Sequence, residues 1–282
     1  MFLGYCCAVP VLACLIAIYQ PSARVFPNQS SAWRLADFAE RLDKYRASEP
    51  PQTVFIGPCY VQTVLDEASE MPHTSLCMGG LRQSEIEYIL KHYVRPSDRV
   101  CVPITFHNIS TQSLPIRREI ASRAFRNISL WRSRIRYALS LESYQPPLPA
   151  PVTKQQIAAY REATETQYTE AICRWALPEV ISAKPYTDAE IDRFHRFVKD
   201  YPTVHFILFP TLRLKRVMDT SLRSAVDNAK IRDRQIQRIG KAYNWQDLSS
   251  LCNAADFTTT NHLSPRGAEK VANYVVELFI SE

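Results

Sequence analysis

Short apolar runs alternate with amphipathic segments along most of the chain, a pattern typical of an α/β protein. The apolar runs are bounded by proline, glycine or polar turn residues, as buried parallel strands are. They predict strands at 53–57, 98–106, 203–210 and about 245–248. Residues at helical spacing predict helices at 33–47, 84–94, 154–175, 188–201 and 220–243, with a last helix that starts at 264–265.

Two of these helices carry clear start signals. Thr187 and Glu190 form a capping box before 188–201, and Ser264 followed by Pro265 is an N-cap with proline at the first helical position. Strands that alternate with helices pair in parallel and need helices on both faces. We therefore expect a three-layer, doubly wound parallel sheet.

The middle of the chain breaks the alternation. We interpret residues 107–200 as a helical insertion between two strands, in the position of a lid over the sheet. Within it, 114–143 has an apolar stripe at three- and four-residue spacing and seven arginines between Arg117 and Arg136. Such a helix either packs its stripe on the domain with a solvated arginine face or contacts anionic lipid or polymer. Residues 145–152 are proline-rich and predict an extended linker.

The N-terminus is strongly apolar, with no charged residue from Phe2 to Tyr19. Two interpretations compete: a signal peptide cleaved near Ala23, and an uncleaved transmembrane anchor formed by residues 1–23. The length of the run and the poor cleavage site favour the anchor. Because Arg24 and Arg34 follow it, the positive-inside rule would place residues 24–282 in the cytosol.

Composition narrows the function classes. The hydrophobic fraction of 46% fits a protein with a sizeable core, and the formal net charge of +6 is a mild excess that does not require an acidic partner. No zinc-finger spacing or RNA-binding aromatic signature accompanies the charge, so nucleic acid is a poor candidate partner. The eight cysteines include no CxxC pair, which disfavours structural zinc, and several lie in apolar runs where a buried free thiol is the simple interpretation.

One cysteine and one histidine stand out by position. The run "TVFIGPCYVQT" ends a strand at Gly57 and places Cys59 just beyond it, and His262 lies between the last strand and the last helix. Ligands of open α/β sheets bind beyond the carboxyl ends of the strands. A thiol at that edge can attack an acyl carbon when a base such as His262 takes its proton.

These segments resemble the SGNH (GDSL-type) hydrolases, whose sheet is flavodoxin-like. The resemblance is stronger to a membrane-anchored branch that includes the D-alanyl transfer protein of teichoic acid synthesis and the alginate-type O-acetyltransferases. In that branch a Gly-x-Ser ends the first strand, and the last motif reads approximately Phe-x-Asp-x-x-His-Leu-Asn/Ser-x-x-Gly-Ala. The residues in register with that last motif are Phe257, His262, Leu263, Ser264, Gly267 and Ala268. The resemblance covers about 50–106 and 200–282.

The resemblance implies roles for further residues and for partners. Gly57 matches the first-block glycine, Gly79 or Gly80 would donate a backbone N–H to the oxyanion, and Asn108 is the candidate for the fourth-block asparagine. A membrane acyl-donor protein would be a partner and a cell-surface glycan or similar hydroxyl polymer the acceptor. No metal or organic cofactor is implied. The resemblance also implies an extracytoplasmic catalytic domain, which is the opposite of the orientation that the positive-inside rule predicts.

Two departures from the family pattern bear on activity. Cys59 stands where the family has serine, and Thr259 stands where it has the aspartate that orients the imidazole. Asp256 is a candidate substitute for that aspartate. A thiol needs less activation than an alcohol, so a Cys-His dyad can function without the carboxylate. Three hypotheses remain open. The first is an acyltransferase or esterase, the second is an inactive SGNH-like module that binds a glycan or scaffolds a membrane acyltransferase complex, and the third is a cysteine hydrolase unrelated to glycans.

Overall fold

A computed structural model describes the chain over residues 31–68, 71–78, 81–105, 109, 152–164, 167–212, 214–215, 220–259 and 262–280. The predictions for residues 1–23, the arginine-rich helix 114–143 and all of the linker 145–152 except its last residue lie outside these residues, as do those for Gly79, Gly80 and Asn108. Within the described part of the chain, no helix combines the length and the apolar character needed to cross a bilayer.

Five strands of the described chain form one sheet in the order β2-β1-β3-β4-β5, and every neighbouring pair is parallel. The prediction of a parallel sheet is confirmed. The strands are β1 Thr53–Phe55, β2 Thr74–Ser75, β3 Arg99–Ile104, β4 Val204–Leu208 and β5 Gln246–Asp247. The longest register joins β3 to β4 over five residues, from the pair Val100–Val204 to the pair Ile104–Leu208.

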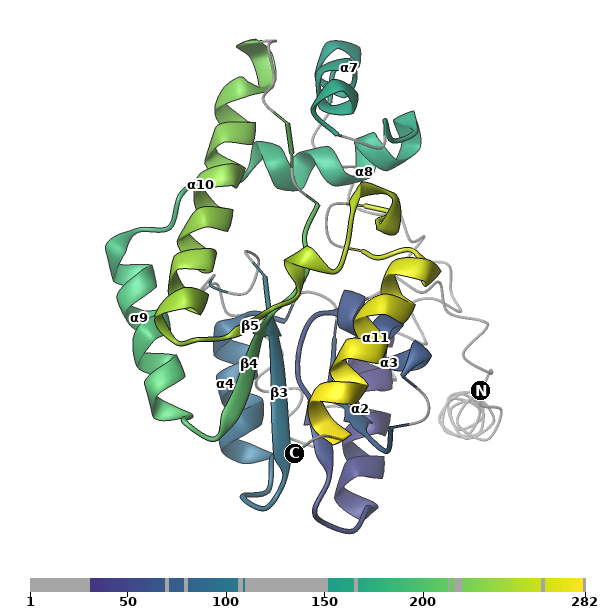
Figure 1. Ribbon diagram of the computed structural model, residues 1–282, viewed down its shortest axis with the longest axis vertical. Coiled ribbons are helices and arrows are strands. Elements are labelled where there is room, and N and C mark those ends of the chain that lie inside the picture. Colours follow the sequence, from purple (N-terminus) through teal and green to yellow (C-terminus); the bar gives the residue numbers. More distant parts are fainter. Residues whose placement is uncertain are drawn as a thin grey trace, which may run out of the picture.

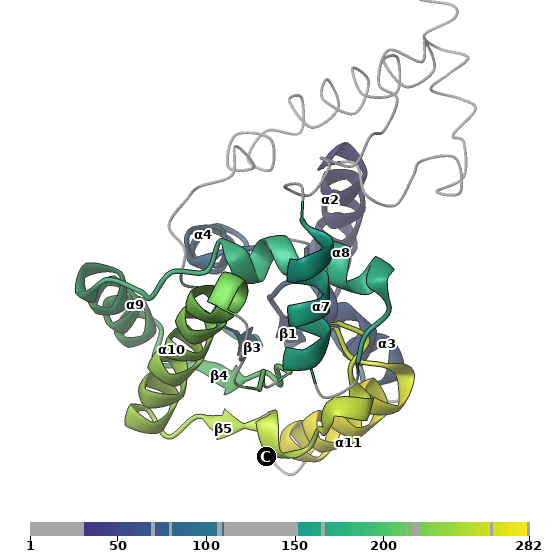
Figure 2. The ribbon, with the colours of Figure 1, turned by 90° about the horizontal axis from the view of Figure 1, so that it is seen from above.

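Helices surround this sheet, and Figures 1 and 2 show their arrangement. The α-helices are α2 Ser31–Ala47, α3 Cys59–Glu67, α4 Gln83–His92, α7 Lys154–Ala163, α8 Glu170–Ile181, α9 Asp188–Asp200, α10 Thr220–Ala242 and α11 Pro265–Ile280. Two 3-10 turns, η2 Leu248–Ser250 and η3 Ala254–Asp256, connect β5 to α11. In the view from above, α4, α9 and α10 lie on one side of the strands and α3 and α11 on the other (Figure 2).

Alternate residues of each strand face opposite sides of the sheet, which divides the core in two. Val54 and Ile56 pack into a cluster with the apolar faces of α2, α4, α9 and α10, whereas Phe55 belongs to a second cluster with α3, α11, α7 and α8. The same alternation appears in β3, where Val100 faces the first cluster and Cys101 the second. A side-chain period of two on a sheet buried on both faces produces this arrangement.

The prediction of one helix over 154–175 is wrong. The structure has two helices there, because Thr164 leaves the helical conformation at the end of α7 and Gln167 has a positive φ of 47°. Thr169 then starts α8 as its N-cap, with its hydroxyl accepting a hydrogen bond from the Ile172 N–H. The capping box predicted at Thr187 is present at the start of α9.

The helices of the middle segment occupy two different places. α9 packs its apolar face on the sheet, as the helix between two parallel strands must. In contrast, α7 and α8 lie beyond the upper end of the sheet in Figure 1, where the segment that follows β4 also runs. The Lys215 N–H donates to the Ala163 carbonyl at 2.7 Å and joins that segment to α7.

A buried carboxylate at the opposite end of the strands fixes α2 and β1 to the start of β3. Asp98 accepts hydrogen bonds from the Tyr45 hydroxyl and, at 2.9 Å, from the Gln52 N–H. Arg95 pairs with the same carboxylate at 3.1 Å and lies over the Tyr45 ring. Burial alone would raise the pKa of Asp98, but the hydrogen bonds from Tyr45, Gln52 and Arg95 and the charge of Arg95 together outweigh it, and the pKa is lowered.

Replacing this carboxylate should destabilise the fold. We expect Asp98→Ala to lower the free energy of unfolding at neutral pH by about 3 kcal/mol, because it leaves Arg95 and the Tyr45 hydroxyl without their partner. Since the pKa of Asp98 is lowered, the difference from wild type should shrink as the pH falls through that pKa. Urea unfolding of both proteins at several pH values measures this difference in the free energy of unfolding. Asp43→Asn, an exposed change on α2, is the control and should cost no more than about 0.5 kcal/mol; equal effects of the two changes would contradict the prediction.

Candidate active site

The strand order places the end of β1 at a natural binding position. In the order 2-1-3-4-5 the chain connections reverse direction between β1 and β3, and ligands of such sheets bind at the carboxyl ends of the strands beside this point. Cys59 lies there, directly after β1, as the first residue of α3. Its side chain is exposed, and Pro58 precedes it as the N-cap residue in an extended conformation. The positive end of the α3 dipole therefore stabilises a thiolate at Cys59.

His262 reaches the same edge of the sheet from the far end of the chain. It lies between η3 and α11, on a turn closed by an isolated antiparallel bridge between Phe257 and Leu263. The His262 carbonyl accepts hydrogen bonds from the Thr258 N–H at 2.8 Å and the Thr258 hydroxyl at 3.2 Å. The Nε2 atom of the His262 imidazole is 3.8 Å from the Cys59 Sγ atom, which is within hydrogen-bonding reach for sulfur. The structure thus brings together two residues 203 positions apart in the sequence.

Thr259 occupies the other side of the imidazole. Its hydroxyl oxygen is 2.9 Å from His262 Nδ1 and also accepts the His262 backbone N–H at 3.2 Å. A hydroxyl oxygen has two acceptor lone pairs, so it can take both N–H groups. When Thr259 accepts a hydrogen bond from Nδ1, the imidazole is in the tautomer that carries its proton on Nδ1. Nε2 then presents its lone pair to the thiol. Thr259 therefore stands where an orienting aspartate would, but it brings no negative charge.

Three aromatic contacts position the pair, and sequence reasoning missed all of them. The Tyr60 ring meets the His262 ring edge-on at 5.8 Å, while its hydroxyl is hydrogen-bonded to the Thr105 hydroxyl. Phe209, just after β4, packs on Tyr60 with ring centroids 5.2 Å apart. Tyr168, from the middle segment, donates its hydroxyl to the Thr259 carbonyl at 3.1 Å. Only Tyr60 carried a sequence signal, because it adjoins Cys59.

The half-buried environment of His262 affects its protonation. Burial lowers the pKa of the imidazole from its ordinary value, because the charged form loses hydration. The neutral ring is therefore the main species at neutral pH, which suits a residue that accepts a proton from a thiol.

Asp256 has a different task from the one considered in the sequence. It is fully buried, and its carboxylate pairs with Lys270 at 2.7 Å and Arg266 at 3.2 Å, both on α11. It also accepts the Asn253 N–H at 2.9 Å and closes the capping box of η3. Burial would raise the pKa of Asp256, but the hydrogen bond from Lys270 leads the opposing effects and the pKa is lowered. The carboxylate thus anchors α11 instead of facing the imidazole.

Glycine is required at position 267 because α11 approaches the backbone of Asp256 closely there. A Cβ atom built on Gly267 would lie 2.3 Å from the Asp256 carbonyl oxygen and 2.9 Å from the Asp256 Cβ atom, so only glycine allows this approach of α11. Gly57 is less demanding, with the closest atom, in Val61, at 3.3 Å. The Gly57 carbonyl accepts the Met78 N–H at 2.8 Å and ties the end of β1 to the segment after β2.

The other described cysteines differ from Cys59. Cys77, Cys101 and Cys173 are buried, as the apolar runs indicated, and burial raises the pKa of the Cys77 thiol to about 11. Burial likewise raises the pKa of Cys252 to about 11. Cys59 is the exposed thiol among the described cysteines. The described residues contain no group of three His, Cys, Asp or Glu side chains that could hold a metal ion.

Comparisons with known proteins add little to this geometry. A scan against protein-family models and a search of curated proteins found no match. Among solved structures, the chain is similar to a GDSL-like lipase from Bacteroides thetaiotaomicron, with a TM-score of 0.44 and 9% identity over 88% of this chain and 98% of that one. It is also similar to a protein described as an acylhydrolase from Bacteroides fragilis, with a TM-score of 0.43 and 12% identity over 90% and 99% of the two chains. Likeness at this level says nothing about activity, so the assignment of the candidate site rests on the geometry of its own residues.

The close approach at Gly267 predicts a specific loss. We expect Gly267→Ala to lower the free energy of unfolding by about 1–3 kcal/mol, because the added methyl group pushes α11 away from the Asp256 turn. Thermal or denaturant unfolding measures the change. Glu269→Ala, an exposed change two residues along the same helix, is the matched control and should be nearly neutral. A neutral Gly267→Ala would show that α11 does not need this contact.

Proposed function

We propose that the protein is an acyltransferase or esterase that uses Cys59 as nucleophile and His262 as general base. The observation that carries this proposal is the 3.8 Å contact between an exposed thiol and a half-buried imidazole at the carboxyl edge of the sheet. The last-motif residues in register with SGNH hydrolases support it independently of this contact.

The reaction would proceed in two balanced steps. The Cys59 thiol attacks the carbonyl carbon of an acyl donor and its proton passes to His262 Nε2. When the tetrahedral intermediate collapses, the bond to the leaving group breaks, that group takes the proton from the imidazolium, and a thioester remains on Cys59. His262 then deprotonates an acceptor hydroxyl or water, which attacks the thioester and restores the thiol.

Stabilisation of the oxyanion would come from the backbone. The first turn of α3 directs its N–H groups toward the nucleophile's end of the helix, and these are suited to the developing negative charge. In this proposal the acceptor is a cell-surface glycan or similar hydroxyl polymer, the donor is a membrane acyl-donor protein, and residues 1–23 anchor the chain with the catalytic domain outside the cytoplasm. These assignments come from the family resemblance and the apolar N-terminus.

A second function is favoured by one feature of the site. Thr259 gives His262 a hydrogen bond but no negative charge, so the imidazolium formed during acyl transfer lacks the stabilisation that an aspartate supplies. The alternative is a catalytically inactive module of the same fold that binds a glycan or scaffolds a membrane acyltransferase complex.

Acyl labelling separates the two functions. After exposure of the full-length protein to a small activated ester, we expect intact mass and peptide mapping to find the acyl group on Cys59. His262→Ala should slow this labelling by roughly a hundredfold or more, because it removes the base. Cys59→Ser is the control for the site of attachment. Labelling spread over several cysteines at rates unchanged in His262→Ala would mean ordinary thiol chemistry and would favour the binding module.

The pH dependence of acylation tests the role of Thr259. Because burial lowers the pKa of His262, the wild-type rate should fall only below the ordinary imidazole range, as acid protonates the base. Thr259→Asp places a carboxylate beside Nδ1, which stabilises the imidazolium and should move the acid limb of the profile to higher pH. The rate on the plateau should rise by roughly tenfold.

Thr259→Asn serves as the matched control for that change, since it has nearly the shape of aspartate without its charge. It should leave the acid limb near its wild-type position. If Thr259→Asp and Thr259→Asn give the same profile, the residue does not act on the imidazole electrostatically.

A further inference from the structure

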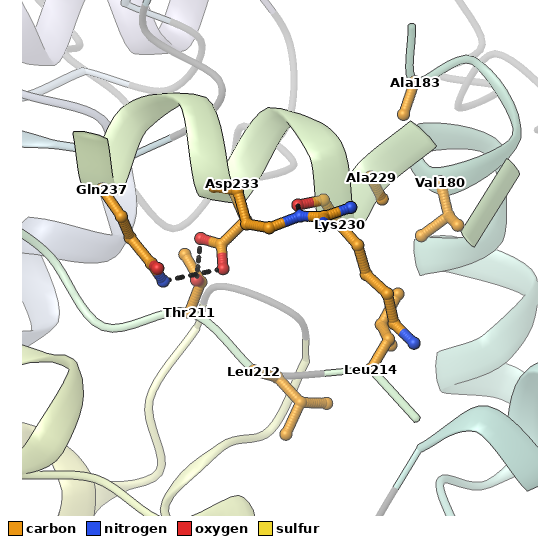
Figure 3. Close-up of a pocket in the computed structure, with 10 residues that line it drawn as sticks. Val180, Ala183, Thr211, Leu212, Leu214, Ala229, Lys230, Asp233 and Gln237 are labelled. Atoms are coloured by element: carbon orange, nitrogen blue, oxygen red, sulfur yellow. Dashed lines mark hydrogen bonds between the residues drawn. The ribbon is translucent and has the colours of Figure 1, made fainter. Parts of the chain in front are cut away.

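A pocket of about 450 Å³, with neither Cys59 nor His262 in its lining, lies between α8, α10 and the segment that follows β4 (Figure 3). This volume falls within the usual range for small-molecule sites. The reaction proposed above does not use it. Its lining residues come from elements that are far apart in the sequence. The pocket is therefore created by the fold and not by a single sequence motif.

One wall of the pocket is apolar. Val180 and Ala183 at the end of α8 face Ala229 on α10, and Leu212 and Leu214 line the side formed by the segment after β4. Leu212 is itself buried in the core cluster, and Leu214 and Ala229 pack against that cluster. Such a surface binds the apolar part of a ligand by removing it from water.

The polar residues of the pocket lie on one face of α10 and differ in how they are engaged. The Asp233 carboxylate accepts hydrogen bonds from the Gln237 amide at 3.0 Å and the Thr211 hydroxyl at 3.4 Å. Arg234 donates its Nε–H to the Lys230 carbonyl at 3.3 Å. With two cationic side chains and one carboxylate, the lining has a net charge of +1.

Lys230 is the residue that defines the ligand. Figure 3 shows its side chain reaching from α10 across the pocket toward Leu214, away from the Asp233 group. Within the described residues, its ammonium makes no ion pair or hydrogen bond. A half-buried cation beside an apolar wall lacks an anion of the protein's own, and a bound anion would supply it.

We propose that this pocket binds a small amphiphilic carboxylate, with the carboxylate at Lys230 and the hydrocarbon part along Val180, Leu212 and Leu214. The net charge of the lining matches one negative charge, and the two kinds of wall match the two ends of such a molecule. A medium-chain fatty acid is the simplest member of this class.

The pocket and the dyad share one structural element but are separate sites. Phe209, at the start of the segment after β4, packs on Tyr60 beside His262, and Leu212 lies three residues further on, at most about 10 Å along the chain. Binding in the pocket needs neither Cys59 nor His262. The inference therefore stands or falls independently of the proposed acyl transfer.

Isothermal titration of the full-length protein with octanoate tests the proposal. Octanamide, which has the same chain without the charge, is the matched ligand. We expect octanoate to bind to wild type, and Lys230→Met to weaken it by roughly tenfold or more because the charge-assisted contact is lost while the stem remains. Lys230→Arg should retain most of the affinity. Octanamide should bind wild type and Lys230→Met equally and more weakly than octanoate binds wild type.

Two further variants locate the site. Ala229→Phe fills the pocket and should abolish binding of both ligands, with its thermal unfolding measured to show that it folds. Cys59→Ser should bind octanoate as wild type does. The proposal is overturned if octanoate fails to bind wild type at millimolar concentration, or if its affinity is unchanged in Lys230→Met or in folded Ala229→Phe.

Discussion

The ion pair between the buried Asp256 and Lys270 holds the C-terminal helix against the turn that carries His262. Two further features depend on this contact. The glycine at 267 permits the close approach, and the Ser264 N–H donates to the Asp256 carbonyl at 2.8 Å where the helix begins. With α11 fixed in this way, the bridge between Phe257 and Leu263 is held at the start of the helix, and the imidazole lies within reach of the Cys59 thiol.

The reaction that we propose combines a reactive nucleophile with a weakly supported base. A thiol at a helix N-terminus loses its proton more readily than an alcohol, so the cost of lacking a carboxylate beside His262 is smaller for Cys59 than it would be for serine. The departures at 59 and 259 are therefore chemically consistent with each other. A serine paired with Thr259 would be harder to activate.

The middle segment contributes to the protein in two places at the carboxyl edge. Tyr168 holds the backbone of Thr259 through its hydroxyl, and α8 supplies one wall of the pocket that contains Lys230. Both lie near the segment after β4, which contacts Tyr60 at one end and α7 at the other. The middle segment thus does more than join two strands. It shapes the edge of the sheet at which ligands bind in folds of this kind.

The sequence by itself determined four of the five strands and most helix starts, because these depend on local features; the two-residue strand β2 was missed. Val54 and Ile56 alternate with Phe55 in a run bounded by turn residues, and the Thr187 and Ser264–Pro265 caps act within a few residues of themselves. It also singled out Cys59 and His262, since both follow strands. The break between α7 and α8 was missed because Gln167 gives no clear signal for a left-handed conformation.

Only the tertiary structure decided which charged and polar groups serve the site. Asp256 and Thr259 were both candidates to support His262, and the fold pairs Asp256 with Lys270 and Thr259 with the imidazole. Tyr168 and Lys230 had no signal at all, because their roles arise from contacts with segments remote in the sequence. Side-chain partners of this kind depend on how helices pack on the sheet, and local patterns do not encode that packing.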